Sequence, residues 1–283
     1  MKSCWIVTKD HQNYLEFRDV PVPQPKAGEI VIRVHASALN RGEIFVGGVV
    51  HGGPEKPGGN EASGVVHAVG EGVTGVKAGD AVFGRVRGGF AEYALMDAHQ
   101  IMRKPEKLSW EQAAAVPVSF ITAWEMIYLY GKLKAGETLL VMGASSGAGV
   151  ACIQLAKLIG ARSIGTSGSQ QKLDTLKTVG LDVGIATRKP DFAEAVKQAT
   201  GGKGVDLVIN GVGGSVFADA CARWHSAGAW RPWAMLTTCS RPRSTSTRCM
   251  RAGWKFSAFP TRGCRPAARP SPPPDSCATC CRR

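Results

Sequence analysis

The chain has 283 residues, 44% of them hydrophobic, and a formal charge of +13 at pH 7. Such a charge suggests nucleic-acid binding, but residues 219–283 alone carry a net +10 and the first 218 residues only +3. We therefore expect no nucleic-acid partner. An apolar stretch at residues 139–156 is interrupted by three glycines, so we expect no membrane-spanning helix and no membrane partner.

The first part of the chain predicts a small, mostly antiparallel β domain. Glycine-rich turns separate its predicted strands, which lie at residues 29–36, 61–69, 81–85 and 91–96. The first of these alternates with period two, as a half-exposed strand does. Ser109 and Gln112 predict a capping box for a short helix that ends before Pro117. An apolar helix at residues 119–130 then leads into a second domain, and we place the boundary near residue 120.

Between Glu137 and Lys157 the sequence predicts a strand, a glycine turn and a helix. Residues 138–142 form a short apolar run of the kind that a parallel sheet buries on both faces. The turn at residues 143–149 is followed by helical periodicity that stops at Gly160. Small residues at such a turn let a pyrophosphate approach the free N–H groups of a helix N-terminus. This pattern predicts a dinucleotide site.

Strands and helices continue to alternate after this motif. We predict strands at residues 162–167, 183–186 and 205–210, and helices at residues 170–179 and 191–200. Asp191 and Glu194 suggest a capping box for the second helix. The alternation predicts an α/β fold with a doubly wound parallel sheet, which assigns residues 121–218 to a nucleotide-binding domain.

Several motifs occur in an order that resembles one known family. They are residues 38–43 (ALNRGE), 59–66 (GNEASGVV), 76–84 (VKAGDAVFG), 88–93 (GGFAEY), 122–124 (TAW) and 143–149 (GASSGAG). Together they resemble the medium-chain dehydrogenase/reductases, in particular the zinc-free, zeta-crystallin-like quinone oxidoreductase branch, over about residues 1–218. The resemblance implies a GroES-like substrate domain (residues 1–120), a Rossmann-type domain, a catalytic cleft between them, and a homodimer.

Residues 219–283 do not continue this pattern. They contain seven of the nine cysteines and show neither helical nor strand periodicity. A one-base shift in the underlying codons can restore an apolar strand like the one the family has here. We therefore predict an out-of-frame, disordered tail that leaves the Rossmann-type sheet C-terminally incomplete. We also expect strand 205–210 to have an unpaired edge, which puts the family's dimer in doubt.

The residues present argue against a zinc site. Zinc-dependent relatives have a cysteine near Leu39-Asn40 and a histidine where this chain has Asn60, and His35 and His67 lie in predicted strands. Without a Lewis acid, the resemblance implies hydride transfer from a reduced nicotinamide to a small electrophile, a quinone or a conjugated enone. It implies that Asn40 lines the substrate end and that Thr122 contacts the nicotinamide. Alternatives are an enoyl thioester reductase and an inactive, frameshifted, non-enzymatic product.

The second predicted strand indicates which cofactor binds. NAD sites usually have an acidic residue at its end, whereas this chain has Ser167 followed by Lys172, which suits the 2′-phosphate of NADPH. The other predicted cofactor-binding residues are Ser145, Ser146, Gly147, Ala148, Gly149 and Asn210. Asn210 replaces an aspartate that is frequent in the family. Cys4 and Cys152 are isolated, as in a reduced cytoplasmic protein, and we expect a cytoplasmic location.

Overall fold

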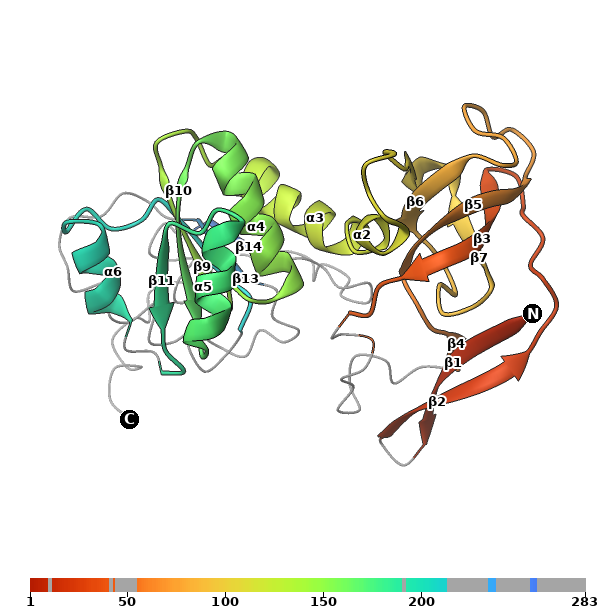
Figure 1. Ribbon diagram of the computed structural model, residues 1–283, viewed down its shortest axis with the longest axis horizontal. Coiled ribbons are helices and arrows are strands. Elements are labelled where there is room, and N and C mark those ends of the chain that lie inside the picture. The colour runs from red at the N-terminus through yellow and green to blue at the C-terminus, as the bar shows by residue number, and fades with distance from the viewer. Residues whose placement is uncertain are drawn as a thin grey trace, which may run out of the picture.

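The computed structural model describes residues 1–9, 12–40, 43, 55–189, 192–212, 234–237 and 255–258. Figure 1 shows two bodies, a β-rich domain that contains the N-terminus and an α/β domain built on a parallel sheet. The helices α2 and α3 lie between them. Within the described residues no helix is long and apolar enough to cross a membrane.

The β-rich domain consists of two sheets. One has the order β2-β1-β4 and the other the order β7-β3-β5-β6-β8, and neighbouring strands in both are antiparallel. The strands are β1 (Lys2–Lys9), β2 (Gln12–Asp19), β3 (Glu29–Ser37), β4 (Lys56–Pro57), β5 (Glu61–Val69), β6 (Ala81–Arg85), β7 (Tyr93–Asp97) and β8 (Ile101–Arg103), with a short 3₁₀ helix η1 (Ala98–Gln100) before β8. The four predicted strands are confirmed as β3, β5, β6 and β7, whereas β1 and β2 were not predicted.

The core of this domain explains why β3 alternates only in part. Ile30, Val31 and Ile32 are all fully buried, and alternation begins only at Arg33. β3 pairs with β5 along one edge and β7 along the other, and the burial of three successive residues shows that both of its faces are covered near its start. A strand in the middle of a curved sheet therefore departs from the simple in–out pattern.

Two helices connect the domains. α2 (Trp110–Ala114) has the predicted capping box, in which Ser109 Oγ accepts from Gln112 N and Gln112 Oε1 accepts from Ser109 N. α3 (Pro117–Trp124) begins two residues earlier than predicted, with proline at its first position, where a missing N–H costs nothing. It continues as a π-helix, η2 (Glu125–Tyr130), so the predicted single helix is two segments of different pitch.

The α/β domain follows the predicted alternation. Its elements are β9 (Thr138–Met142), α4 (Gly147–Ile159), β10 (Arg162–Ser167), α5 (Gln170–Thr178), β11 (Val183–Ala186), α6 (Ala193–Ala199) and β12 (Leu207–Asn210). α4 ends at Gly160, which has the left-handed φ of 81° that favours glycine at a helix C-terminus. α6 begins after Phe192, which makes no side-chain cap, and Asp191 of the predicted capping box lies outside the described residues.

Helix α4 is held by an apolar face against the sheet. Its Ala151, Ile153 and Ala156 are fully buried in one cluster with Leu139 and Val141 of β9. Small side chains on the helix bring its axis close to the strands, which fixes the helix N-terminus at the end of β9. Packing of this face therefore positions the glycine turn.

The predicted open edge at residues 205–210 is wrong. β12 pairs with β9 on one side and with β13 (Ala234–Thr237) on the other, and β14 (Lys255–Ala258) pairs with β13. All are parallel, giving the order β11-β10-β9-β12-β13-β14. Backbone ladders need no particular side chain, so two short apolar-containing stretches suffice to extend the sheet. The reading-frame hypothesis remains a prediction, and DNA sequence across the codons for residues 217–224 would test it.

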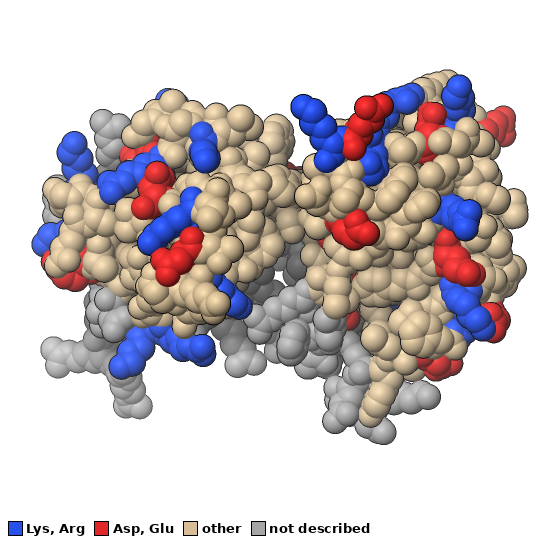
Figure 2. All heavy atoms as spheres, viewed as in Figure 1, with Lys and Arg blue, Asp and Glu red and all other residues tan. Residues whose placement is uncertain are grey.

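The described surface carries both signs of charge. Figure 2 shows Lys and Arg side chains interspersed with Asp and Glu over both domains, without a large patch of one sign on this face. This agrees with the small net charge of the first 218 residues.

Candidate functional site

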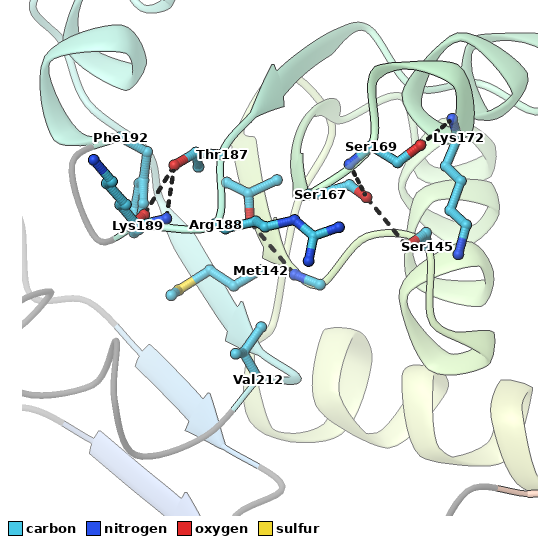
Figure 3. A pocket seen from close by; sticks show the side chains of 13 residues that line it. Met142, Ser145, Ser167, Ser169, Lys172, Thr187, Arg188, Lys189, Phe192 and Val212 are labelled. Atoms are coloured by element: carbon cyan, nitrogen blue, oxygen red, sulfur yellow. Dashed lines mark hydrogen bonds between the residues drawn. The ribbon is translucent and has the colours of Figure 1, made fainter.

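A cavity of about 470 Å³ opens at the carboxyl ends of the parallel strands. It is lined by Met142, Gly143, Ser145, Thr166, Ser167, Gly168, Ser169, Lys172, Thr187, Arg188, Lys189, Phe192 and Val212 (Figure 3). From β9 the chain proceeds to β10 and β11 on one side, and β12 lies on the other side of β9. Ligands of open α/β sheets bind at the carboxyl ends where the strand order reverses in this way.

The glycine turn between β9 and α4 is held by backbone hydrogen bonds. Ala144 N donates to Thr166 O at 2.9 Å and Ser146 N donates to Gly143 O at 3.0 Å. Gly143 has a φ of 74°, which a residue with a side chain rarely adopts. A Cβ added at Gly149 would lie only 2.6 Å from Ala144 O, so this glycine lets the helix start fold back onto the turn. The close approach explains the spacing of the small residues.

The N-terminus of α4 offers unused donors. Ser146 is the N-cap, and its Oγ accepts from Gly149 N at 3.1 Å. Among the described residues, the amides of Gly147 and Ala148 donate no backbone hydrogen bond. A helix N-terminus with free N–H groups carries a partial positive charge and favours an anion. This turn therefore has the chemistry of a phosphate site.

Ser167 lies at the end of β10 beside the turn. Its Oγ is 3.3 Å from Ser145 Oγ, and it accepts from Ser169 N at 3.4 Å. Ser169 is the N-cap of α5 and accepts from Lys172 N at 3.4 Å. These contacts place two hydroxyls and the start of α5, which carries Lys172, on one side of the cavity.

Among the described residues, three cations line the cavity, namely Lys172, Arg188 and Lys189, and no acidic residue does. No ion pair among the described residues involves any of them. In Figure 3 the Arg188 side chain extends from the end of β11 toward Ser145 and Ser167, whereas Lys189 extends away. A Cβ added at Gly168 would lie 2.8 Å from Arg188 Cγ, so this arginine crosses the backbone at a glycine.

Sequence reasoning missed Arg188 and Lys189. Parallel pairing sets Ser167 of β10 beside Ala186 of β11, so the residues that follow β11 reach the same edge of the sheet as the residues that follow β10. The signal was available as two cations directly after the third predicted strand. An anion bound at the carboxyl ends of these strands would be contacted by the residues that follow β10 and by those that follow β11.

The predicted cofactor residues fall into three groups. Ser145, Ser167 and Lys172 line the cavity. Ser146, Gly147, Ala148 and Gly149 form the end of the turn and the start of α4. Asn210 is fully buried at the end of β12, where its Oδ1 accepts from Val212 N at 3.0 Å, and it does not line the cavity.

The predicted substrate-side residues lie elsewhere. Asn40 follows β3 and is half-buried, and its Nδ2 donates to Glu61 Oε1 at 2.7 Å. Thr122 is a half-buried residue of α3. Neither lines the cavity at the strand ends. Their roles toward substrate and nicotinamide remain predictions.

Glu61, which belongs to the motif at residues 59–66, is a buried carboxyl with 1% exposure. Burial raises the pKa of this carboxyl above its ordinary value, and hydrogen bonds donated by Val118 N and Asn40 Nδ2 act in the opposite direction. Smaller contributions come from Glu43, which raises the pKa, and Arg85, which lowers it. Because both oxygens accept hydrogen bonds, the geometry suits the ionised carboxylate.

The two histidines considered as ligands lie in strands, as predicted. His35 of β3 stacks on Trp110 with ring centroids 4.3 Å apart, and His67 of β5 makes an edge contact with Tyr93 at 4.9 Å. In the described part of the chain, no group of three or more His, Cys, Asp or Glu side chains lies close enough to hold a metal.

Cys152 of α4 is expected to be unreactive in the folded protein. It is fully buried, and burial raises the pKa of its thiol to about 12. At pH 8 the thiolate would be roughly one part in ten thousand, so iodoacetamide should label Cys152 only after unfolding. Mass spectrometry of this peptide with and without urea measures the difference. Equal labelling in both conditions would contradict the packing of α4.

Two family models match the chain. Residues 26–106 match an alcohol dehydrogenase GroES-like domain, and residues 147–231 match a family described as zinc-binding dehydrogenase. The first covers most of the β-rich domain. The second begins at the first residue of α4 and extends into the segment beyond residue 218.

Named relatives agree with these matches. Human quinone oxidoreductase is 35% identical over 196 residues, which are 68% of this chain and 60% of the relative. A mycocerosic acid synthase-like polyketide synthase of Mycobacterium tuberculosis is 36% identical over 208 residues, 71% of this chain and 10% of that protein. A mycobacterial protein solved in complex with NADPH superposes with a TM-score of 0.80 at 26% identity, covering 91% of this chain and 81% of that structure.

The chain thus spans about 60% of the length of the quinone oxidoreductases it matches. Its residues 26–106 match the GroES-like model, and its α/β domain has a parallel sheet with a glycine turn at the strand ends. The order of the motifs, the family matches and the structural likeness agree. This chain belongs to the medium-chain dehydrogenase/reductase superfamily, in its quinone oxidoreductase branch.

Proposed function

We propose that this chain binds NADPH and reduces a quinone or a conjugated carbonyl compound by hydride transfer without zinc. The observations that carry the proposal are the free amides at the start of α4 and, beside the glycine turn, a cavity that the described residues line with three cations and no acid. A dinucleotide with an additional phosphate is the ligand whose charges match this lining best.

The residues fit the cofactor at two points. The amides of Gly147 and Ala148 would bind the diphosphate at the start of α4. Lys172 and Arg188, with the hydroxyl of Ser167 between the two strand ends, would bind the 2′-phosphate. An NAD site would instead have an acidic residue near Ser167 to accept from the ribose hydroxyls. At the end of β10 this chain has Ser167, Gly168 and Ser169 and no acid, which favours NADPH.

When bound, the reduced nicotinamide supplies a hydride to the acceptor, and a proton from water completes the reduction. The protein then has to bind the cofactor and the acceptor and to hold them in the orientation that hydride transfer requires. Asn40, whose amide is held by Glu61, would orient the acceptor, and Thr122 of α3 would contact the nicotinamide. An already electron-poor acceptor needs no metal to polarise it.

An enoyl thioester reductase is the second candidate. The match of 208 residues to a polyketide synthase supports it. Both candidates use the same hydride donor and differ only in the acceptor. A third outcome, an inactive frameshifted product, would follow if the chain folds without forming the cofactor site.

The test uses the full chain. We expect NADPH to raise the midpoint of thermal unfolding at concentrations where NADH does not, by linkage of binding to folding. Turnover is then measured as NADPH oxidation with 1,4-benzoquinone and, separately, with a 2-enoyl thioester. The quinone assignment requires activity with the first and not the second. A chain that unfolds cooperatively but gains no stability from NADPH would overturn the cofactor proposal.

A further inference from the structure

The carboxylate of Glu61 joins two segments that are far apart in sequence. Its Oε1 accepts from Asn40 Nδ2 at 2.7 Å, and its Oε2 accepts from Val118 N at 2.6 Å. Glu61 is the first residue of β5, Asn40 follows β3, and Val118 is the second residue of α3. Each oxygen of one buried side chain is therefore used by a different part of the molecule.

The start of α3 requires such an acceptor. Its N-cap residue, Val116, makes no side-chain hydrogen bond, and Pro117 has no N–H to donate. The amide of Val118 is one of the helix N-terminal donors that lack an intrahelical partner. Glu61 supplies an acceptor from the β-rich domain, and its negative charge is favoured at a helix N-terminus.

Asn40 is restrained in two ways. Its backbone is fixed by Glu43, because Asn40 N donates to Glu43 Oε2 at 2.9 Å and Glu43 N donates to Asn40 O at 2.9 Å. Its side chain is fixed by Glu61, because an ionised carboxylate only accepts and so selects the amide nitrogen over the amide oxygen. Asn40 Oδ1 and the second N–H make no other hydrogen bond among the described residues, so their direction is set by Glu61.

The same helix start also contacts the glycine turn. A Cβ added at Gly147 would lie 2.8 Å from Ser119 Oγ, so Ser119 lies against the first residue of α4. Ser119 directly follows Val118, and Thr122 is one helical turn further along. The hydrogen bond from Val118 to Glu61 therefore fixes the first turn of α3 between Asn40 and α4.

We propose that Glu61 is a positioning residue that fixes the amide orientation of Asn40 and, through Val118, the placement of α3 against the glycine turn. The proposal rests on the proposed function in one respect, namely that Asn40 faces the acceptor during reduction. It adds a residue, outside the cavity lining, on which the geometry between acceptor and nicotinamide depends.

Glu61→Gln separates the two contacts. Val118 N can only donate, so the new amide oxygen must remain toward Val118 and the new NH₂ group must face Asn40. Asn40 then has to rotate its amide so that Oδ1 accepts from residue 61. Its NH₂ group then points where Oδ1 pointed before. Glu61→Ala removes both contacts. Glu92→Gln is the matched control, because Glu92 Oε2 also accepts from a backbone amide, that of Lys2, at an exposed site.

With an acceptor that the chain reduces, we expect Glu61→Gln to lower kcat roughly 10- to 100-fold, while the Kd for NADPH is unchanged. In an Asn40→Ala background the same substitution should have no further effect on kcat, because the amide that it reorients is gone. The control should leave both constants unchanged. An unchanged kcat, or an equal loss with and without Asn40, would overturn the proposal.

A chain that binds NADPH but reduces no acceptor would refute the proposed activity and not this inference. The inference is then decided by hydrogen exchange in the full, ¹⁵N-labelled chain. We expect Glu61→Gln to speed exchange of the Asn40 side-chain amide roughly tenfold while the Val118 amide stays protected, and Glu61→Ala to speed both. Exchange at Asn40 that does not respond to either substitution would exclude the positioning role.

Discussion

Replacing Lys172 and Arg188 together by glutamine should weaken NADPH binding about 100-fold and change NADH binding by less than about threefold. Hydrogen bonds to a charged group contribute about 1.5–3 kcal/mol each, and every 1.4 kcal/mol is a factor of ten in affinity. Both cations line the cavity beside Ser167, and neither has an acidic partner among the described residues. The double substitution therefore removes the partners of the 2′-phosphate of NADPH without breaking an ion pair among the described residues.

The measurement is isothermal titration of each variant with both dinucleotides. Lys203→Gln is the matched control, since this lysine is exposed and does not line the cavity. It should bind both dinucleotides like the unchanged chain. An equal loss of NADPH and NADH affinity in the double variant would mean that the cations bind the diphosphate and not the 2′-phosphate. Unchanged NADPH affinity would place the cofactor elsewhere.

Gly149→Ala should destabilise the chain by about 3 kcal/mol and abolish stabilisation by NADPH, although alanine is the better helix former by about 1 kcal/mol. The added Cβ would lie 2.6 Å from Ala144 O and 2.7 Å from Gly143 O. Both contacts are with backbone, so relief requires the turn to move away from α4. The steric cost therefore exceeds the gain in helix propensity, so the substitution lowers the free energy of unfolding instead of raising it.

Thermal unfolding with and without NADPH measures both parts of this prediction. Gly72→Ala is the control, because Gly72 has a φ of 74° and no atom within 4 Å of an added Cβ. That variant should lose about 1 kcal/mol from backbone strain alone and keep its full response to NADPH. A Gly149→Ala chain as stable as the parent would show that the turn is looser than the structure indicates.

Local pattern was sufficient to predict the strands and helices of the α/β domain from β9 to β12. β9, β10 and β11 have the predicted bounds because each is a short run between a glycine or helix end and a loop. The predicted turn at residues 143–149 is also present in the structure. Its small residues are required because the backbone segments lie too close together for side chains, as between Gly149 and Ala144. Where residues that are close in sequence determine the local structure, one sequence is enough to predict it.

Contacts between distant segments were not predictable in the same way. Arg188 lies against Gly168 only through the register of β10 with β11, and Glu61 contacts Val118 only once α3 lies against the β-rich domain. The pairing of β12 with β13 likewise depends on a segment whose composition suggested no strand. Sequence pattern gives the residues of each element, whereas these contacts depend on how the elements pack.

The glycine at position 168 has a consequence for how such a protein can diverge. Because the guanidinium stem of Arg188 lies over bare backbone there, any side chain at 168 displaces the arginine without altering a single charge. Under the proposed function, a single substitution at Gly168 can therefore relax the preference between the two dinucleotides through side-chain bulk alone, while every cation of the pocket is retained.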